Sequence, residues 1–304
     1  MGVKKRVFAS ASERTNFYKL DRRWGDKYRI YHNLPFLNVF TPTNLRDATL
    51  FDRTGLTGSL TLSDAEFNRL KKTSIDYVLC DADDQPILAI EFDGLCEGFS
   101  AGVDYHPVQE SGGTPWRKEF MELKLRVAHG SSFPYYVLGS DAFEHLAPDV
   151  KVMVVDGIIG QVLSAMAAEH RHSPEEHGYT AAEFDALPID TRADIVEDFV
   201  IFQDVQAETQ HNPISKLEHQ LKREVGYTGC SLEPVNCPSN APLQDCLLTG
   251  LRVVLHTPDQ GDIARSVMLP SFKCPHFDGW SLCKSVGLIL AMIELKRRRA
   301  QGGA

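Results

Sequence analysis

The sequence lacks the motifs that identify several common enzyme classes. It has no Walker-type or dinucleotide-binding glycine-rich loop and no G-x-S-x-G element of a Ser-His-Asp hydrolase. It also has no C-x-x-C pair, and the intervals between Cys230, Cys237 and Cys246 are too wide for a zinc knuckle. The seven cysteines are therefore expected to be ordinary reduced thiols. The alternative is a structural zinc site supplied by Cys230, Cys237, Cys246, Cys274, His276 and Cys283.

Long hydrophobic runs are also scarce. The opening MGVKKRVFASASERTN carries charge but no apolar core of signal-peptide length. The apolar run at residues 286–293 (VGLILAMI) is too short to cross a bilayer. These features predict a soluble, cytoplasmic protein with no membrane association.

Positive charge is in deficit overall, since the 304 residues carry a net charge of -9. This balance argues against a protein that coats nucleic acid, but it does not exclude a nuclease, because the distribution of charge matters more than its sum. Residues 1–50 contain ten Lys and Arg against four Asp and Glu. That segment is either a phosphate-contacting surface or an ordinary solvated face.

Hydrophobic periodicity predicts alternating helices and strands. Helices are expected at 12–22, 63–70, 116–129, 157–169, 191–210, 215–225 and the C-terminal end, where the basic run 296–299 suits the helix dipole. Strands are expected at 28–31, 36–40, 75–80, 87–92, 134–138, 151–155, 251–255 and 264–269, with loops at 41–62 and 94–115. The predicted organisation is an α/β domain over residues 1–168, a polar linker at 169–190 and a smaller α+β region at 191–304.

The clearest local pattern is a hairpin that carries carboxylates. The runs 75–80 and 87–92 flank a turn-like five-residue loop, and pairing Cys80 with Pro86 and Leu79 with Ile87 sets Asp76 opposite Ile90 or Glu91. Because side chains alternate along a strand, Glu91 and Asp93 share one face.

Crowded carboxylates repel one another, and desolvation raises their pKa, so a divalent cation would relieve both penalties. Mg²⁺ prefers a few oxygen ligands and leaves room for water and phosphate, as phosphodiester hydrolysis requires; Mn²⁺ is the alternative metal. However, strand ends that meet solvent are often acidic, so the pattern also fits a purely structural explanation.

The string SIDYVLCDADDQPILAIEFDG resembles the core motif of the PD-(D/E)XK nuclease superfamily, in which an Asp on one strand precedes Glu-x-Lys on the next. The segments ASERTNFYKL, DKYRIYHNLPFLNVF, FNRLKKTSIDYVL and KLRVAHGSSFPYYVL are similar to those of a bacterial subgroup known as a domain of unknown function, which has an I-E-x-D motif. The resemblance covers roughly residues 10–140. It implies a restriction-endonuclease-like mixed sheet flanked by helices.

The resemblance also implies roles for particular residues. Asp76 and Glu91 would be metal ligands, and Glu13 on the first helix would be an auxiliary ligand. Asp93 stands where the motif has lysine, so the sequence departs from the family at this position. Lys124, on the helix expected to face the hairpin, is the candidate for a relocated lysine.

Basic and aromatic side chains near these positions are candidates for contact with nucleic acid. Trp116, Arg117 and Lys118 open the helix after the hairpin, where they could stack on and neutralise a strand, although packing against the sheet is the more common use of such an aromatic. Arg14 belongs to the basic N-terminal segment, and Lys118 is the second choice for the relocated lysine.

The sequence therefore predicts a Mg²⁺-dependent endonuclease or exonuclease that acts on nucleic acid, with DNA the expected substrate. One alternative is a nucleic-acid-binding module whose site is catalytically degenerate. Another is an interaction protein whose C-terminal region forms a homodimer or binds a partner protein. Fold analogy alone does not decide among them.

Overall fold

The computed structural model describes residues 11–40, 49–51, 57–59, 62–93, 96–100, 104–107, 115–139, 146–171, 178–192, 194–195, 206–208, 210–235, 248–270 and 274–302. The chain divides into two compact units. Unit 1 comprises Met1–Glu144 with Phe272–Pro275, and unit 2 comprises His145–Ser271 with His276–Ala304.

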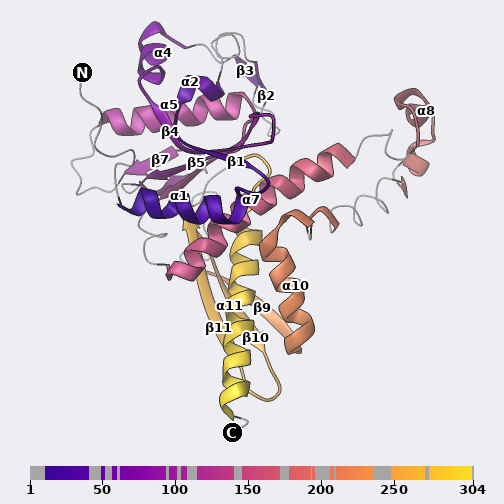
Figure 1. Ribbon diagram of the computed structural model, residues 1–304. Helices are drawn as coiled ribbons and strands as arrows, with labels where there is room; N and C mark the ends of the chain where they lie inside the picture. The colour runs from indigo at the N-terminus through magenta and orange to yellow at the C-terminus, as the bar shows by residue number, and fades with distance from the viewer. Residues whose placement is uncertain are drawn as a thin grey trace. The chain divides into compact units, whose positions relative to one another are not determined.

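Unit 1 is built on a mixed four-stranded sheet in the order β1-β4-β5-β8. Strands β1 (Arg29–Pro35), β4 (Ser74–Cys80) and β5 (Pro86–Asp93) pair antiparallel, whereas β8 (Tyr135–Gly139) pairs parallel to β5. A parallel neighbour needs a crossover connection, and helix α5 (Pro115–Gly130) lies within it. Helix α1 (Ala11–Trp24) and α5 lie on opposite sides of this sheet (Figure 1).

Aromatic side chains join α1 to its face of the sheet. The ring centroids of Phe17 and His32 are 6.1 Å apart, those of His32 and Tyr77 5.5 Å, and those of Tyr77 and Phe92 5.4 Å. Since Glu91 is the chain neighbour of Phe92, its side chain points to the other face, toward α5. Burial of each large apolar side chain in such a core contributes about 1.5–3 kcal/mol.

Several short elements complete unit 1. Helix α4 (Asp64–Leu70) begins with the expected capping box, because the Ser63 hydroxyl accepts from Glu66 N while the Glu66 carboxylate accepts from Ser63 N. The expected strand at 36–40 is wrong: Pro35 ends β1, and α2 (Phe36–Val39) buries Phe36 in a helical turn. The segments expected to be loops contain two hairpins, whose short Gly-, Thr- and Ser-containing strands lack a strong apolar alternation. These are β2 (Thr49–Phe51) with β3 (Thr57–Ser59), and β6 (Cys96–Ser100) with β7 (Asp104–Pro107).

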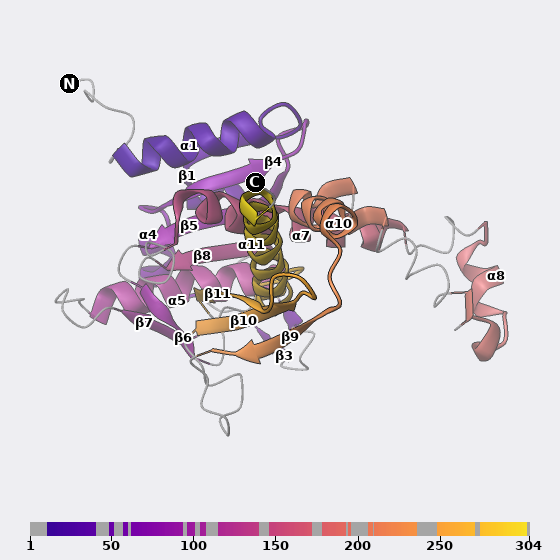
Figure 2. The same ribbon diagram turned by 90° about the horizontal axis from the view of Figure 1, so that it is seen from below.

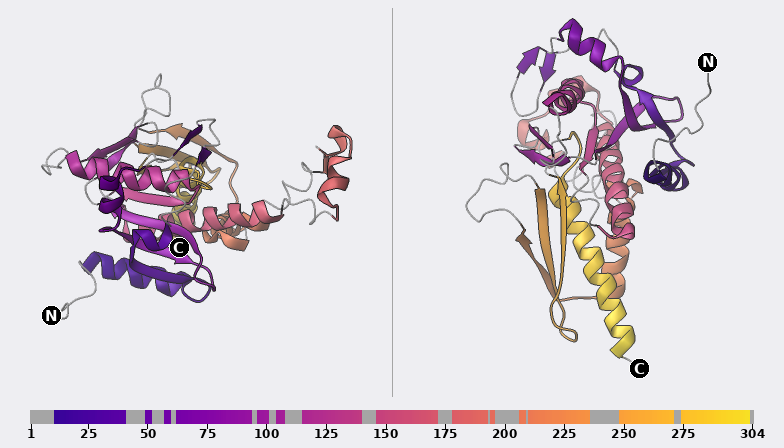
Figure 3. Two further views of the ribbon diagram at one scale, coloured as in Figure 1. Left: turned by 90° about the horizontal axis from the view of Figure 1, so that it is seen from above. Right: turned by 90° about the vertical axis from the view of Figure 1, so that its left-hand side faces the viewer.

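Unit 2 contains an antiparallel three-stranded sheet in the order β11-β10-β9. The strands are β9 (Gly229–Pro234), β10 (Leu248–His256) and β11 (Ile263–Pro270), of which β9 was not predicted. Helix α11 (Gly279–Gly302) packs on β10 and β11, as Figure 2 shows where α11 is seen nearly end-on. Helix α10 (Pro213–Val225) packs beside α11 (Figure 3, right).

The strand expected at 151–155 is wrong, because these residues belong to the 24-residue helix α7 (Pro148–Arg171). The run KVMVV has high β-propensity, but Val150, Val154 and Ile158 recur at helical spacing and are all buried, so packing overrides propensity.

The division of the chain after Glu144 also assigns α7 to unit 2, whereas the predicted boundary was residue 168. Of the expected linker 169–190, residues 172–177 lie outside the described part, and the rest includes α8 (Ala181–Asp185). Most of the helix expected at 191–210 also lies outside it.

By length and composition alone, Pro148–Ala168 of α7 could cross a membrane. However, 61% of its most apolar window is buried within the structure, and the core helix of a globular protein passes the same test. The finding is therefore weak evidence, and the absence of membrane association stays a prediction.

The basic end of α11 does more than suit the helix dipole, because each of its four cations has an acidic partner. The ion pairs are Lys296–Glu224, Arg297–Glu294, Arg298–Glu294 and Arg299–Asp259. Two of these acids lie outside α11, one on α10 and one in the β10–β11 turn. The basic run therefore fastens α11 to its neighbours within unit 2.

Candidate active site on the hairpin of β4 and β5

The β4–β5 pairing determines where the predicted carboxylates lie. Tyr77 pairs with Ile90, so of the two predicted positions for Asp76 only the one opposite Glu91 continues the register. The predicted pairing of Leu79 with Ile87 is wrong, because Leu79 pairs with Leu88. An irregularity between Leu79 and Cys80 restores the expected pair of Cys80 and Pro86 at the turn.

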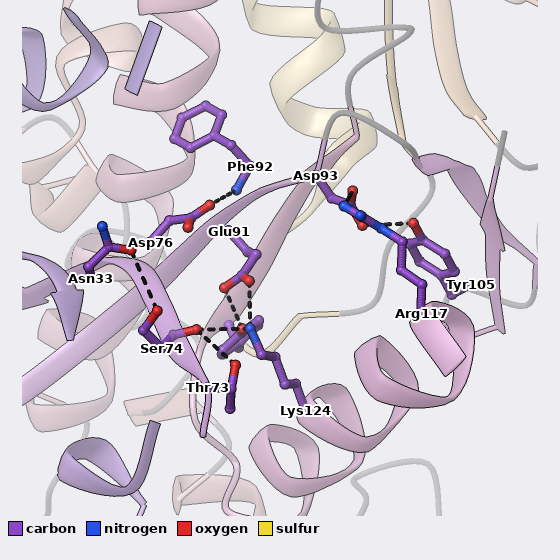
Figure 4. A network of polar contacts seen from close by, with 11 residues as sticks. Asn33, Thr73, Ser74, Asp76, Glu91, Phe92, Asp93, Tyr105, Arg117 and Lys124 are labelled. Carbon is purple, nitrogen blue, oxygen red and sulfur yellow. Dashed lines mark hydrogen bonds and ion pairs between the residues drawn. The ribbon is translucent and has the colours of Figure 1, made fainter. Parts of the chain in front are cut away.

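Glu91 is held by two donors from different elements (Figure 4). Lys124 Nζ on α5 lies 2.6 Å from Glu91 Oε1, and the Tyr135 hydroxyl on β8 donates to Glu91 Oε2 at 2.7 Å. The Lys124 side chain is 3% exposed and that of Glu91 11%. Lys124 also donates to the Ser74 carbonyl at 2.9 Å. Lys124, the residue that the sequence singled out on α5, thus brings an ammonium group into direct contact with Glu91.

The charge of Glu91 also acts on its tyrosine neighbour. Burial, the Glu91 charge and the hydrogen bond to Glu91 together raise the pKa of Tyr135 well above its ordinary value. Tyr135 therefore stays protonated at neutral pH and acts as a fixed donor.

Asp93 lies at the end of β5 and has a separate set of partners. Arg117 forms an ion pair with Asp93 Oδ1, and the Tyr105 hydroxyl donates to Oδ2 at 2.7 Å. Burial, then the hydrogen bond to Asp93, raises the pKa of Tyr105. Burial opposes the charge of Arg117, but the hydrogen bond and charge of Asp93 outweigh it and raise the Arg117 pKa. In Figure 4, Asp93 turns away from Glu91 toward this pair. Because Asp93 turns to this separate set of partners, the fold does not bring it together with Glu91, as the predicted supporting role at a metal would require.

Asp76 is half-buried, and its Oδ2 accepts from the backbone N–H of Phe92 at 2.8 Å. This side-chain bond fixes the carboxylate beside β5, at the point where the regular pairing of β4 with β5 has stopped.

Glu91 and Asp93 do not depend on the expected divalent cation for relief, because Lys124, Arg117 and the hydroxyls of two tyrosines contact their carboxylates within the fold. Among the residues that the structure describes, no three or more His, Cys, Asp or Glu side chains are arranged to hold a metal ion. Asp76 and Glu91 remain a two-carboxylate oxygen donor set. That set fits Mg²⁺, which proteins often hold through one or two carboxylates together with water and substrate phosphate.

Of the other predicted residues, Arg14 and Lys118 do not join this site. Arg14 is exposed on α1, which packs on the face of the sheet opposite to Glu91. Lys118 forms an exposed pair with Glu122 on α5, 3.6 Å apart, whereas Lys124 is the lysine that contacts Glu91. Glu13 lies on α1 and Trp116 on α5, but the side chains of both are outside the described part.

Sequence reasoning missed three groups at the site: Tyr105, Tyr135 and the carbonyl of Ser74. A signal for Tyr135 was present, because a tyrosine within a buried apolar strand needs an acceptor for its hydroxyl. No comparable signal exists for Tyr105, since the β6–β7 hairpin that carries it was not predicted.

Comparison of the chain with protein-family models, with curated proteins and with solved structures gives no match. The resemblance to the nuclease superfamily therefore rests on the hairpin motif and its flanking segments.

Proposed function

We propose that unit 1 is a metal-dependent nuclease that hydrolyses phosphodiester bonds of nucleic acid, with DNA the expected substrate. The observation that carries the proposal is the contact between Lys124 and Glu91, with Asp76 on the neighbouring strand. The superfamily motif calls for an acid on one strand, a second acid on the next strand and a lysine beside the second acid. The order of helix, three antiparallel strands, helix and parallel strand supports a restriction-endonuclease-like form of the fold.

Each residue of the site has a role in this proposal. Tyr135 and Lys124 hold the two oxygens of Glu91 in one orientation, and the Phe92 N–H holds Asp76. Asp76 and Glu91 would hold Mg²⁺ or Mn²⁺, and the bound metal would supply water activation and charge neutralisation. The Lys124 ammonium would offset negative charge that develops on the phosphate, and its burial would strengthen that effect. Asp93, Arg117 and Tyr105 brace the end of β5.

Two observations favour a second function, a nucleic-acid-binding module that does not cleave. Both oxygens of Glu91 already have protein donors, and Asp93 occupies the position of the motif lysine. A carboxylate neutralised by its own lysine binds a cation less strongly than a free one does.

A plasmid-nicking assay separates the two functions. We expect the full-length protein to nick supercoiled plasmid with Mg²⁺ or Mn²⁺ and to stop when EDTA is added. Asp76→Asn and Lys124→Met should each remove the activity. Asp83→Asn is the matched control, because Asp83 is an exposed carboxylate in the turn of the same hairpin. If the protein retains DNA but does not cleave it at any metal concentration, the binding module is the correct function instead.

A further inference from the structure

Asn33 has an unusual backbone conformation for a residue inside a strand. Its φ is 54°, in the left-handed region, although it lies within β1. Asp84, Ser132 and His276 also have positive φ, but all three lie in loops or turns, where this conformation is ordinary. Asn tolerates it better than most residues, yet such an outlier persists only when the surrounding structure imposes it.

The outlier coincides with a gap in the pairing of β1 with β4. The register runs from Arg29↔Cys80 to His32↔Tyr77 and resumes at Leu34↔Ile75. The position left out is Asn33 opposite Asp76. The β4–β5 pairing also stops one position before Asp76. Asn33, Asp76 and Glu91 therefore stand in a row across three adjacent strands, and regular pairing is interrupted on both sides of Asp76.

The side chain of Asn33 is exposed, whereas Lys124 and Glu91 are buried. Figure 4 shows it next to Asp76. Its Oδ1 accepts from the Ser74 hydroxyl at 3.5 Å, and its Nδ2 lies 3.1 Å from Nε2 of His32. The amide nitrogen carries two N–H groups and no charge. It can therefore donate to an anion at the solvent-facing end of this row without adding a charge beside Asp76.

We propose that Asn33 is a substrate-binding residue, whose side-chain amide donates to a phosphate oxygen of the nucleic-acid strand held at Asp76 and Glu91. This inference rests on the proposed nuclease function and adds to it the side from which the strand enters, the β1 edge of the sheet.

The test compares Asn33→Gly with Ser132→Gly in the full-length protein. Glycine adopts positive φ without a steric penalty, so both variants should fold and melt at or above the wild-type temperature. The readouts are the melting temperature, kcat and KM on a short DNA duplex, and the Kd of a fluorescein-labelled phosphorothioate duplex. A hydrogen bond to a charged phosphate predicts that Asn33→Gly raises KM and Kd about 10- to 100-fold with kcat little changed. Ser132→Gly should leave KM, kcat and Kd at their wild-type values.

Two results would overturn the inference, and they are distinguishable. If the wild type cleaves and Asn33→Gly only raises the melting temperature, Asn33 is merely strained backbone and the nuclease proposal stands. If the wild type neither binds nor cleaves the duplexes, the nuclease proposal fails and the inference fails with it.

Discussion

Lys124 Nζ lies 2.6 Å from Glu91 Oε1, although the two residues are 33 positions apart in the chain and both are buried. An isolated buried charge is costly, so each of these residues requires the other. The same contact that supports the nuclease proposal is therefore also a structural feature of the core, and mutations at it will affect stability as well as activity.

Lys124→Met should destabilise unit 1 by about 3–5 kcal/mol, because it leaves Glu91 buried without its cation. Glu91→Gln removes the charge that Lys124 compensates and should also destabilise. The double variant should be more stable than the sum of the two losses predicts, with a coupling of about 0.5–3 kcal/mol. Urea unfolding of the four proteins in this cycle measures the coupling. Strict additivity would show that the pair makes no mutual contribution.

Asp93→Asn should lower stability without changing the affinity for Mg²⁺, because Asp93 turns away from Glu91 toward Arg117 and Tyr105. The loss of a buried, charge-assisted hydrogen bond typically costs about 1–3 kcal/mol. Asp76→Asn is the comparison, since it should weaken Mg²⁺ binding in a calorimetric titration. A weaker Mg²⁺ site in Asp93→Asn would restore Asp93 to the metal-supporting role that the sequence predicted.

Unit 2 should lose stability in acid through Glu294. The hydrogen bonds from Arg297 and then Arg298 hold the pKa of Glu294 at about 2 instead of 4.5. Because the folded pKa is the lower one, the contribution is fully present above pH 4.5 and is lost as the pH falls toward 2. Glu294→Gln should therefore unfold with a weaker pH dependence in this window. Urea unfolding followed by circular dichroism at several pH values measures the free energy of unfolding of both proteins. If that free energy falls with pH in parallel for the wild type and Glu294→Gln, the assignment to Glu294 is contradicted.

Gly160→Ala should destabilise unit 2, because the added Cβ would lie 2.7 Å from the Asn212 Cα and 2.6 Å from its Oδ1. The backbone at the start of α10 cannot move aside easily, so overpacking of about 1–3 kcal/mol should outweigh the gain of about 1 kcal/mol in helix propensity. Gly157→Ala is the comparison on the same helix, since its nearest neighbour is the end of the Leu282 side chain, which can rotate. Thermal melts that rank Gly157→Ala as the more destabilising would show that α10 adjusts more readily than Leu282.

The hairpin and its flanking helices could be predicted from the sequence, because their signals are local. The apolar runs of β4 and β5 flank a polar turn, and Ser63 with Glu66 marks a helix start directly. The strand expected at 151–155 failed for the opposite reason, since whether a short valine-rich run is helix or strand depends on what it packs against. The hairpin β6–β7 was missed because its strands carry little apolar periodicity.

The identity of the candidate site residues was partly predictable, but their electrostatics were not. Asp76, Glu91 and Lys124 followed from motif and spacing. Long-range packing determines which side chains meet. The ion pair of Asp93 with Arg117, and the neutralisation of Glu91 without a bound ion, both depend on it. A left-handed Asn33 inside a strand has no sequence signature beyond the identity of the residue.

The connection from β5 through α5 to β8 has a consequence for synthesis on the ribosome. Strands β1, β4 and β5 are complete before α5 emerges, and Tyr135 emerges last of all. During that interval the Glu91 carboxylate has neither its lysine nor its tyrosine, so it must remain hydrated and the hairpin cannot bury that face. The site proposed for this protein is therefore complete only once Tyr135 has been made, and a fragment that stops before residue 115 would lack both Lys124 and Tyr135 as partners of Glu91.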